Sequence, residues 1–132
     1  MSDPRGSLPG HDPAEHDTYA LFQRGMSLIA DTHWAQATVP LEKAKRLEPD
    51  KTSIREALGR AYFRSGRYGD AAGEFSAVVE RDPANDYAHF CLGRSLEKVG
   101  DRRAAQRHMS LACGMRPDRS DYRLYRDRLK AA

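Results

Sequence analysis

Histidine and cysteine are the side chains in this sequence with the most direct chemistry, since they ligate metals and act as nucleophiles or general bases. The chain contains five histidines and two cysteines: His11, His16, His33, His89, His108, Cys91 and Cys113. Their spacing fits no CxxC, HExxH, GxSxG or P-loop motif. His89 and Cys91 are two residues apart, so on a helix they would point in different directions. The sequence therefore predicts no catalytic site, no metal site and no cofactor.

Charged side chains offer a second kind of chemistry, the binding of oppositely charged partners. The net charge is +3, with four acids against one arginine in residues 1–17 and six basic residues against three acids in residues 116–132. So small a net charge does not favour a nucleic acid as the partner. Near the C-terminus, four cations share one predicted helical face: Arg119, Arg123, Arg126 and Lys130. We interpret this stripe as the solvated side of a capping helix, with a site for an acidic partner or a nucleic acid as the alternative.

The length and composition predict a small protein that does not insert into membranes. A chain of 132 residues fits a single domain. No apolar run approaches the roughly 20 residues that a membrane-spanning helix requires. The first 17 residues lack the apolar segment of a secretory signal. Two thiols without such a signal fit a reducing compartment, so we expect a cytoplasmic location.

The elements that must position these side chains repeat along the chain with a period of 34 residues. Glycine recurs at positions 25, 59 and 93, alanine at 37, 71 and 105, and proline at 49, 83 and 117. A large apolar residue recurs at a fourth position, as Leu41, Phe75 and Met109. Agreement at this many positions indicates three copies of one structural unit.

The pattern resembles the tetratricopeptide repeat. The stretch LGRAYFRSGRYGDAAGEFSAVVERDP, residues 58–83, carries nearly the whole signature of that family. The resemblance implies an all-α, right-handed α-solenoid of three helix–turn–helix repeats followed by a capping helix. The expected boundaries are a flexible tail at 1–17, repeats at 18–51, 52–85 and 86–119, and a capping helix at 120–132, so that the domain spans 18–132.

Small residues are expected where the two helices of a repeat approach each other and where the chain turns between them. Gly59 and Ala71 would lie at the closest approach, because a larger side chain there would force the helices apart. Gly66 and Gly100 suit the turn, since glycine adopts a positive φ at little cost.

Five residues depart from the family pattern. Arg24 replaces the leucine of the other two repeats, and Arg55 and His89 stand where the family often has a bulky apolar residue. Thr32 stands where the other repeats have the turn glycine, so the turn of the first repeat is expected to differ. Pro40 lies inside the second helix of the first repeat, which predicts a kink or a delayed start.

The resemblance also implies a concave groove, lined by the first helix of each repeat, in which the family binds peptides. Helical spacing places the following residues on that stripe: Tyr19, Phe22, Met26, Arg60, Phe63, Arg64, Tyr87, Phe90, Arg94 and Lys98. The aromatic and methionine side chains would form apolar pockets. The cations would pair with carboxylates. The predicted ligand is an extended or helical peptide with apolar and acidic residues, bound with an affinity on the order of micromolar.

We therefore predict a non-catalytic adaptor or scaffold that binds a protein or peptide partner. The alternative is a self-associating subunit, whose groove or apolar ends join copies into a homo-oligomer. Tyr19, Phe22, Met26 and Ile29 would then be covered by a second copy, or otherwise by the chain's own tail. The sequence disfavours one kind of ligand, the chaperone tails whose terminal carboxylate some members of this family clamp with Lys, Asn and Arg. The matching positions hold Phe22, Met26, Ala57, Tyr87 and Cys91.

Overall fold

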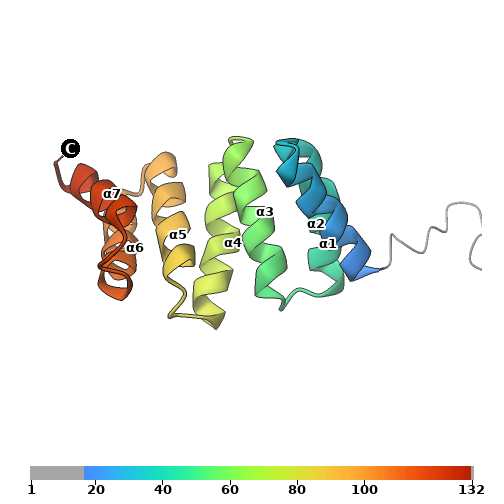
Figure 1. The fold of residues 1–132 in the computed structure, drawn as a ribbon. Helices are drawn as coiled ribbons and strands as arrows, with labels where there is room; N and C mark the ends of the chain where they lie inside the picture. The colour runs from blue at the N-terminus through green and yellow to red at the C-terminus, as the bar shows by residue number, and fades with distance from the viewer. Residues whose placement is uncertain (1–16, 132) are drawn as a thin grey trace, which may run out of the picture.

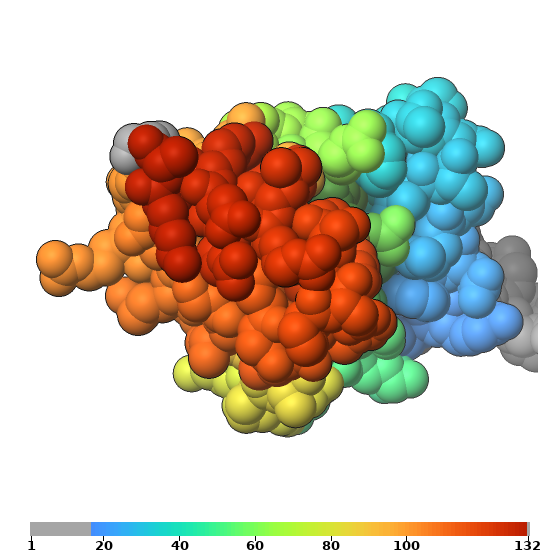
Figure 2. Space-filling view, turned by 60° about the vertical axis from the view of Figure 1, so that its left-hand side comes forward, coloured from blue at the N-terminus to red at the C-terminus, as the bar shows by residue number. Residues whose placement is uncertain are grey.

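The computed structural model describes residues 17–131, and these form seven α-helices and no strand. The helices are α1 (Thr18–Ala30), α2 (Trp34–Leu47), α3 (Thr52–Arg64), α4 (Tyr68–Arg81), α5 (Asp86–Val99), α6 (Arg102–Met115) and α7 (Ser120–Ala131). They lie side by side in one row, with α1 and α2 at one end and α6 and α7 at the other (Figure 1). Figure 2 looks toward the C-terminal end, where α6 and α7 form much of the near surface. The predicted all-α solenoid is confirmed, whereas the predicted tail lies outside the described residues except for Asp17, the N-cap of α1.

Each hairpin turns through one residue in the left-handed conformation. The φ angle is 86° at Gly66, 93° at Gly100 and 61° at Thr32. In the first hairpin the N–H of His33 donates to the carbonyl of Leu28 at 2.8 Å, and the equivalent bonds in the other hairpins are 2.8 and 2.9 Å long. The expected difference in the first turn is therefore wrong, because the same hydrogen bonds hold all three turns. They keep Thr32 in a conformation that costs a residue other than glycine about 1–2 kcal/mol.

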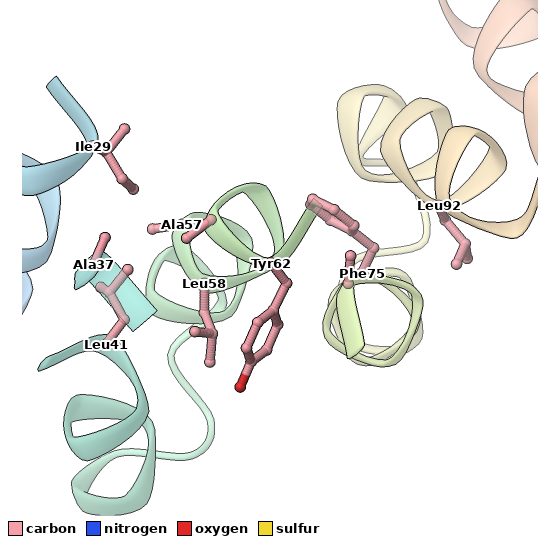
Figure 3. Packing of buried hydrophobic residues seen from close by; sticks show 10 residues of the cluster. Ile29, Ala37, Leu41, Ala57, Leu58, Tyr62, Phe75 and Leu92 are labelled. Atoms are coloured by element: carbon pink, nitrogen blue, oxygen red, sulfur yellow. The ribbon is translucent and has the colours of Figure 1, made fainter. Parts of the chain in front are cut away.

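Glycine allows the two helices of a hairpin to pack closely. A Cβ atom on Gly59 would lie 2.8 Å from Cζ of Phe75, and one on Gly25 would lie 2.5 Å from Cγ of Leu41. Both distances are shorter than van der Waals contact, so the ring and the leucine side chain occupy the space that a larger residue would need. Figure 3 shows Phe75 and Leu41 within the buried cluster that these contacts build.

Neighbouring hairpins complete each other's core. Leu58 and Tyr62 of α3 are buried, and Leu58 belongs to the same cluster as Leu41 of the preceding hairpin (Figure 3). The hydroxyl of Tyr62 also donates a hydrogen bond to Glu42 of α2. Arg24 is the equivalent of Leu58 in the first hairpin and is exposed. It lies at the N-terminal end of the described row of helices, where no hairpin covers it, which explains why this position is not leucine.

A charged residue, Arg55, replaces the apolar residue usual at this position because it pairs with a buried carboxylate. Its Nη1 atom lies 3.0 Å from Oε1 of Glu74 in the second helix of the same hairpin. Nζ of Lys45, from the preceding hairpin, lies 2.7 Å from the other carboxylate oxygen. The Glu74 side chain is only 8% exposed, so the two cations compensate its burial.

His89 and His108 occupy the positions of Arg55 and Glu74 in the third hairpin. Their Nδ1 atoms are 3.0 Å apart while their ring centroids are 5.3 Å apart, so the two Nδ1 corners point toward each other. Nε2 of His89 donates to the carbonyl of Pro83 at 2.8 Å, which leaves its Nδ1 to accept from Nδ1–H of His108. Burial, followed by the nearby His89 and Arg107, lowers the pKa of His108 from its ordinary value.

Pro40 does not delay the second helix. The α2 helix begins at Trp34 and continues through Pro40 to Leu47, so the predicted delayed start is wrong. The proline removes the N–H that the carbonyl of Gln36 would accept in a regular helix. Because Gln36 is exposed, water can replace that donor.

Candidate functional site

A pocket of about 230 Å³ lies between the first helices of the second and third hairpins. We call it the central pocket. The α3 and α5 helices supply most of its wall, and the start of α2 and the middle of α4 complete it. It is lined by Trp34, Arg60, Phe63, Arg64, Phe75, Tyr87, Phe90, Cys91 and Arg94. Sites for small molecules usually occupy about 300–1,000 Å³, so this volume suits a side chain of a peptide better than a cofactor.

Aromatic rings hold two of the pocket's arginines in place. Cζ of Arg64 lies 4.4 Å from the centroid of the Trp34 ring. Cζ of Arg94 lies 4.9 Å from the centroid of Phe63 and 4.6 Å from that of Tyr125, a residue of α7. Stacking uses the face of a guanidinium and leaves its N–H edge able to donate. The two cations are therefore positioned before any ligand arrives.

The three arginines of the central pocket, Arg60, Arg64 and Arg94, have no carboxylate paired with them among residues 17–131. Glu56 lies one turn before Arg60 on α3, and its carboxylate accepts a hydrogen bond from the Asn85 amide at 3.4 Å. Three guanidinium groups around an aromatic floor can bind an acidic group beside an apolar one.

The Cys91 thiol and the Tyr87 phenol of this pocket stay protonated at neutral pH. Burial raises the pKa of the Cys91 thiol to about 12. Burial and the adjacent Cys91 also raise the pKa of Tyr87 to about 12. Because the thiolate is the reactive form of cysteine, Cys91 is a poor nucleophile here. The arrangement favours binding over covalent chemistry.

Six of the ten predicted groove residues line the central pocket: Arg60, Phe63, Arg64, Tyr87, Phe90 and Arg94. Phe90 is only 7% exposed, because α7 packs on its ring. The centroid of Phe90 lies 4.6 Å from that of Tyr122 and 5.4 Å from that of Tyr125. Phe90 thus forms the floor of the pocket and presents little area to a ligand.

The other four predicted groove residues lie outside the central pocket. Tyr19 and Phe22 line a separate hollow of about 580 Å³ beside the start of α1. Met26 is half-buried against the core. Nζ of Lys98 lies 5.7 Å from the centroid of the Tyr68 ring. The structure therefore does not join all ten predicted groove residues in one cavity.

The prediction missed Trp34, which begins α2 and stacks on Arg64. The groove was predicted from the first helix of each repeat only, and Trp34 belongs to a second helix. The 34-residue period could have indicated this contact, because Trp34 aligns with Tyr68 and Arg64 aligns with Lys98. Both pairs place a cation over an aromatic ring between neighbouring hairpins.

Residues 17–131 contain neither a cluster of metal-ligating side chains nor a membrane-spanning helix. No group of three or more His, Cys, Asp or Glu side chains in this range could hold a metal ion. No helix in the same range is long and apolar enough to cross a membrane.

Comparison with solved structures identifies proteins of similar fold. MamA from Desulfovibrio magneticus RS-1, residues 41 to the end, is 21% identical with a TM-score of 0.85, over 88% of this chain and 66% of that one. The first TPR of Spaghetti (RPAP3), solved with the HSP90 peptide SRMEEVD, is 13% identical with a TM-score of 0.81, over 89% of this chain and 93% of that one. At such identities the likeness concerns the fold.

Sequence comparison identifies the family. The TPR repeat-containing thioredoxin TTL4 of Arabidopsis thaliana is 27% identical over 105 residues. The match covers 80% of this chain but only 15% of that protein's length. The family model described as the tetratricopeptide repeat matches residues 22–86 and 56–101, which together span more than half of the sequence. The chain therefore belongs to the tetratricopeptide repeat family.

Proposed function

We propose that this chain is a non-catalytic protein-interaction module whose central pocket binds a peptide segment of a partner protein. The observation that carries the proposal is the set of three arginines, Arg60, Arg64 and Arg94, which surround an aromatic floor without a carboxylate partner among residues 17–131. The likeness in fold to a tetratricopeptide domain solved with a bound peptide supports it.

The pocket's chemistry defines the ligand. An apolar or aromatic side chain would enter beside Trp34 and Phe63, where the wall is a ring surface. Carboxylates on either side of it would accept hydrogen bonds from Arg60, Arg64 and Arg94. A hydrogen bond to a charged group contributes about 1.5–3 kcal/mol, so two such contacts and one buried side chain are consistent with micromolar affinity.

We also propose that the ligand is an internal peptide segment and not a free C-terminus. The positions that would clamp a terminal carboxylate hold Phe22, Met26, Ala57, Tyr87 and Cys91, none of which is a cation. Amidating the C-terminus of a bound peptide should therefore leave its affinity unchanged. The free and amidated forms of SRMEEVD make a suitable pair for this comparison, and a preference for the free acid would contradict the proposal.

An array of peptides tests the main proposal. Each peptide would carry one Phe, Leu or Met flanked by Asp or Glu, and a matched set would replace the acids by Asn and Gln. We expect the wild-type chain to prefer the acidic set and the Arg60→Glu/Arg94→Glu variant to bind at least about tenfold more weakly. Arg46→Glu, an exposed change on α2, is the control that should leave binding unchanged. Equal binding by the wild type and the double variant would refute this use of the pocket.

The end surfaces do not favour the alternative of self-association. Arg24 is exposed at the N-terminal end of the described row. At the C-terminal end Asp127 is exposed, and it stands where the repeat period places the glycine of a further hairpin. Both residues put charge where a stacked copy would need an apolar contact. We expect light scattering across a concentration series to show a monomer, and a mass that rises with concentration would support self-association instead.

A further inference from the structure

A second hollow, separate from the central pocket, lies between α6 and α7 and has a volume of about 710 Å³. We call it the terminal cleft. It is lined by Arg103, Gln106, Arg107, Ser110, Leu111, Arg126 and Lys130. The cleft belongs to the end of the molecule that faces the viewer in Figure 2.

The cleft is open because charged residues replace the apolar residues of the other junctions. The repeat period aligns Arg126 with Leu58 and Lys130 with Tyr62. Leu58 and Tyr62 are buried against the preceding hairpin, whereas Arg126 is half-buried and Lys130 is exposed. Long charged side chains keep their ends in water, so they do not close the junction.

Four cations converge on the terminal cleft with little compensation. Arg103 and Arg107 are one helical turn apart on α6, and Arg126 and Lys130 are one turn apart on α7. Within residues 17–131, the only carboxylate paired with any of them is Asp127, whose Oδ1 lies 3.0 Å from Nε of Arg126. Like charges one turn apart destabilise a helix, so a bound anion would relieve this repulsion.

The backbone carbonyl beside the cleft already accepts hydrogen bonds from other side chains. The carbonyl of Leu129, at the negative end of α7, accepts hydrogen bonds from Arg102 and, at 3.1 Å, from Gln106. Nearby cations of the predicted stripe are also engaged locally: Arg119 pairs with Asp121 at 2.7 Å, and Arg123 donates to a backbone carbonyl. Arg103, Arg107 and Lys130 have no carboxylate partner among residues 17–131 and are the cleft cations available to an external ligand, whereas Arg126 would share its charge with Asp127.

We propose that the terminal cleft binds the phosphate group of a phosphorylated segment of a partner protein. A phosphomonoester carries close to two negative charges at neutral pH and has three acceptor oxygens, which matches several converging donors better than one carboxylate does. Guanidinium groups bind phosphate oxygens in a bidentate manner. The Leu111 side chain at the edge of the cleft is 46% exposed and offers an apolar contact for the residue beside the phosphate. This site does not depend on the function proposed for the central pocket.

A labelled peptide with one phosphoserine, Ala-Ala-pSer-Leu-Ala-Ala, and its unphosphorylated form provide the test by fluorescence anisotropy. We expect the phosphorylated form to bind at least about tenfold more tightly. We also expect inorganic phosphate to raise the melting temperature above that in sodium chloride of equal ionic strength. The Arg103→Gln/Arg107→Gln variant should lose both effects, and because both residues are exposed it should keep the wild-type helical content.

Two control variants separate this site from general charge effects and from the central pocket. Arg46→Gln, an exposed change on α2, and Arg60→Glu/Arg94→Glu in the central pocket should both retain the preference for phosphoserine. Equal binding of the two peptides by the wild type, or an undiminished preference in Arg103→Gln/Arg107→Gln, would overturn the proposal. So would cleft-dependent binding to phosphatidylserine vesicles without any preference for the phosphopeptide, since the cleft would then serve a membrane surface.

Discussion

The junctions between hairpins share one arrangement of helices but differ in chemistry. Between α2 and α3, Leu58 and Tyr62 fill the space and belong to the main buried cluster. Between α6 and α7, the same two positions hold Arg126 and Lys130 around an open cleft. The backbone of a repeat therefore does not determine what its junction does. Apolar side chains fill the first junction, whereas the second leaves a charged cleft beside the buried Tyr122 and Leu129.

The largest effect should come from shortening the equivalent side chains of the two junctions. Leu58→Ala removes a fully buried leucine and should lower the free energy of unfolding by about 3 kcal/mol. Arg126→Ala removes a half-buried, charged side chain and should change it by no more than about 0.5 kcal/mol. Urea unfolding of both variants measures the difference. Similar losses would mean that the charged junction carries as much of the stability as the apolar one.

Introducing apolar residues into the charged junction tests the same comparison in the opposite direction. Replacing Arg126 by Leu and Lys130 by Tyr restores the residues of the apolar junction and should stabilise the chain by about 1–2 kcal/mol through burial of apolar area. The same change should remove the effect of phosphate on the melting temperature. Arg123→Leu, which adds an exposed leucine elsewhere on α7, is the matched control and should do neither. A less stable double variant would show that the cleft cannot close.

The turns provide a smaller comparison between the first hairpin and the other two. Thr32 holds the left-handed conformation that Gly66 and Gly100 hold. Thr32→Gly should therefore stabilise the chain by about 1 kcal/mol, and Gly66→Thr should destabilise it by a similar amount. The melting temperatures of the two variants and the wild type measure these changes. If Thr32→Gly lowered the melting temperature, a contact of the threonine side chain would outweigh its backbone strain.

The smallest expected effect is a dependence of stability on pH, which arises from the paired His89 and His108 of the third hairpin. Since the pKa of His108 is lowered in the folded state, the unfolded chain takes up a proton first as the pH falls. Stability should thus decrease as the pH falls from 7 to 5. In His108→Gln the decrease should be smaller. Identical profiles for the two chains would show that His108 does not contribute to it.

The sequence allowed the fold and part of the site to be predicted, because both follow from the repeat. The period located the hairpins, and helical spacing placed Arg60, Phe63 and Arg64 on one face. Trp34 was missed because it reaches the pocket from the second helix of a neighbouring repeat. The turn at Thr32 was mispredicted because hydrogen bonds within the hairpin override the preference of a single residue. The partner and the cytoplasmic location stay predictions.

Packing between distant parts of the chain is what the period does not encode. Phe90 was expected to be an open anchor, but α7 lies on its ring. Two residues of α7, Tyr122 and Tyr125, make these contacts. Only the position of a helix outside the three repeats decides how much of the predicted surface a ligand can reach.

The stacking of Tyr125 on Arg94 gives the last helix a role beyond covering the end of the solenoid. Tyr125 holds one of the three arginines of the central pocket, although α7 lies outside the three repeats. A protein shortened before Ser120 would keep every repeat motif but would leave Phe63 as the remaining ring beside the Arg94 guanidinium. The smallest version of this domain that keeps its binding geometry therefore extends past the third repeat, through Leu129.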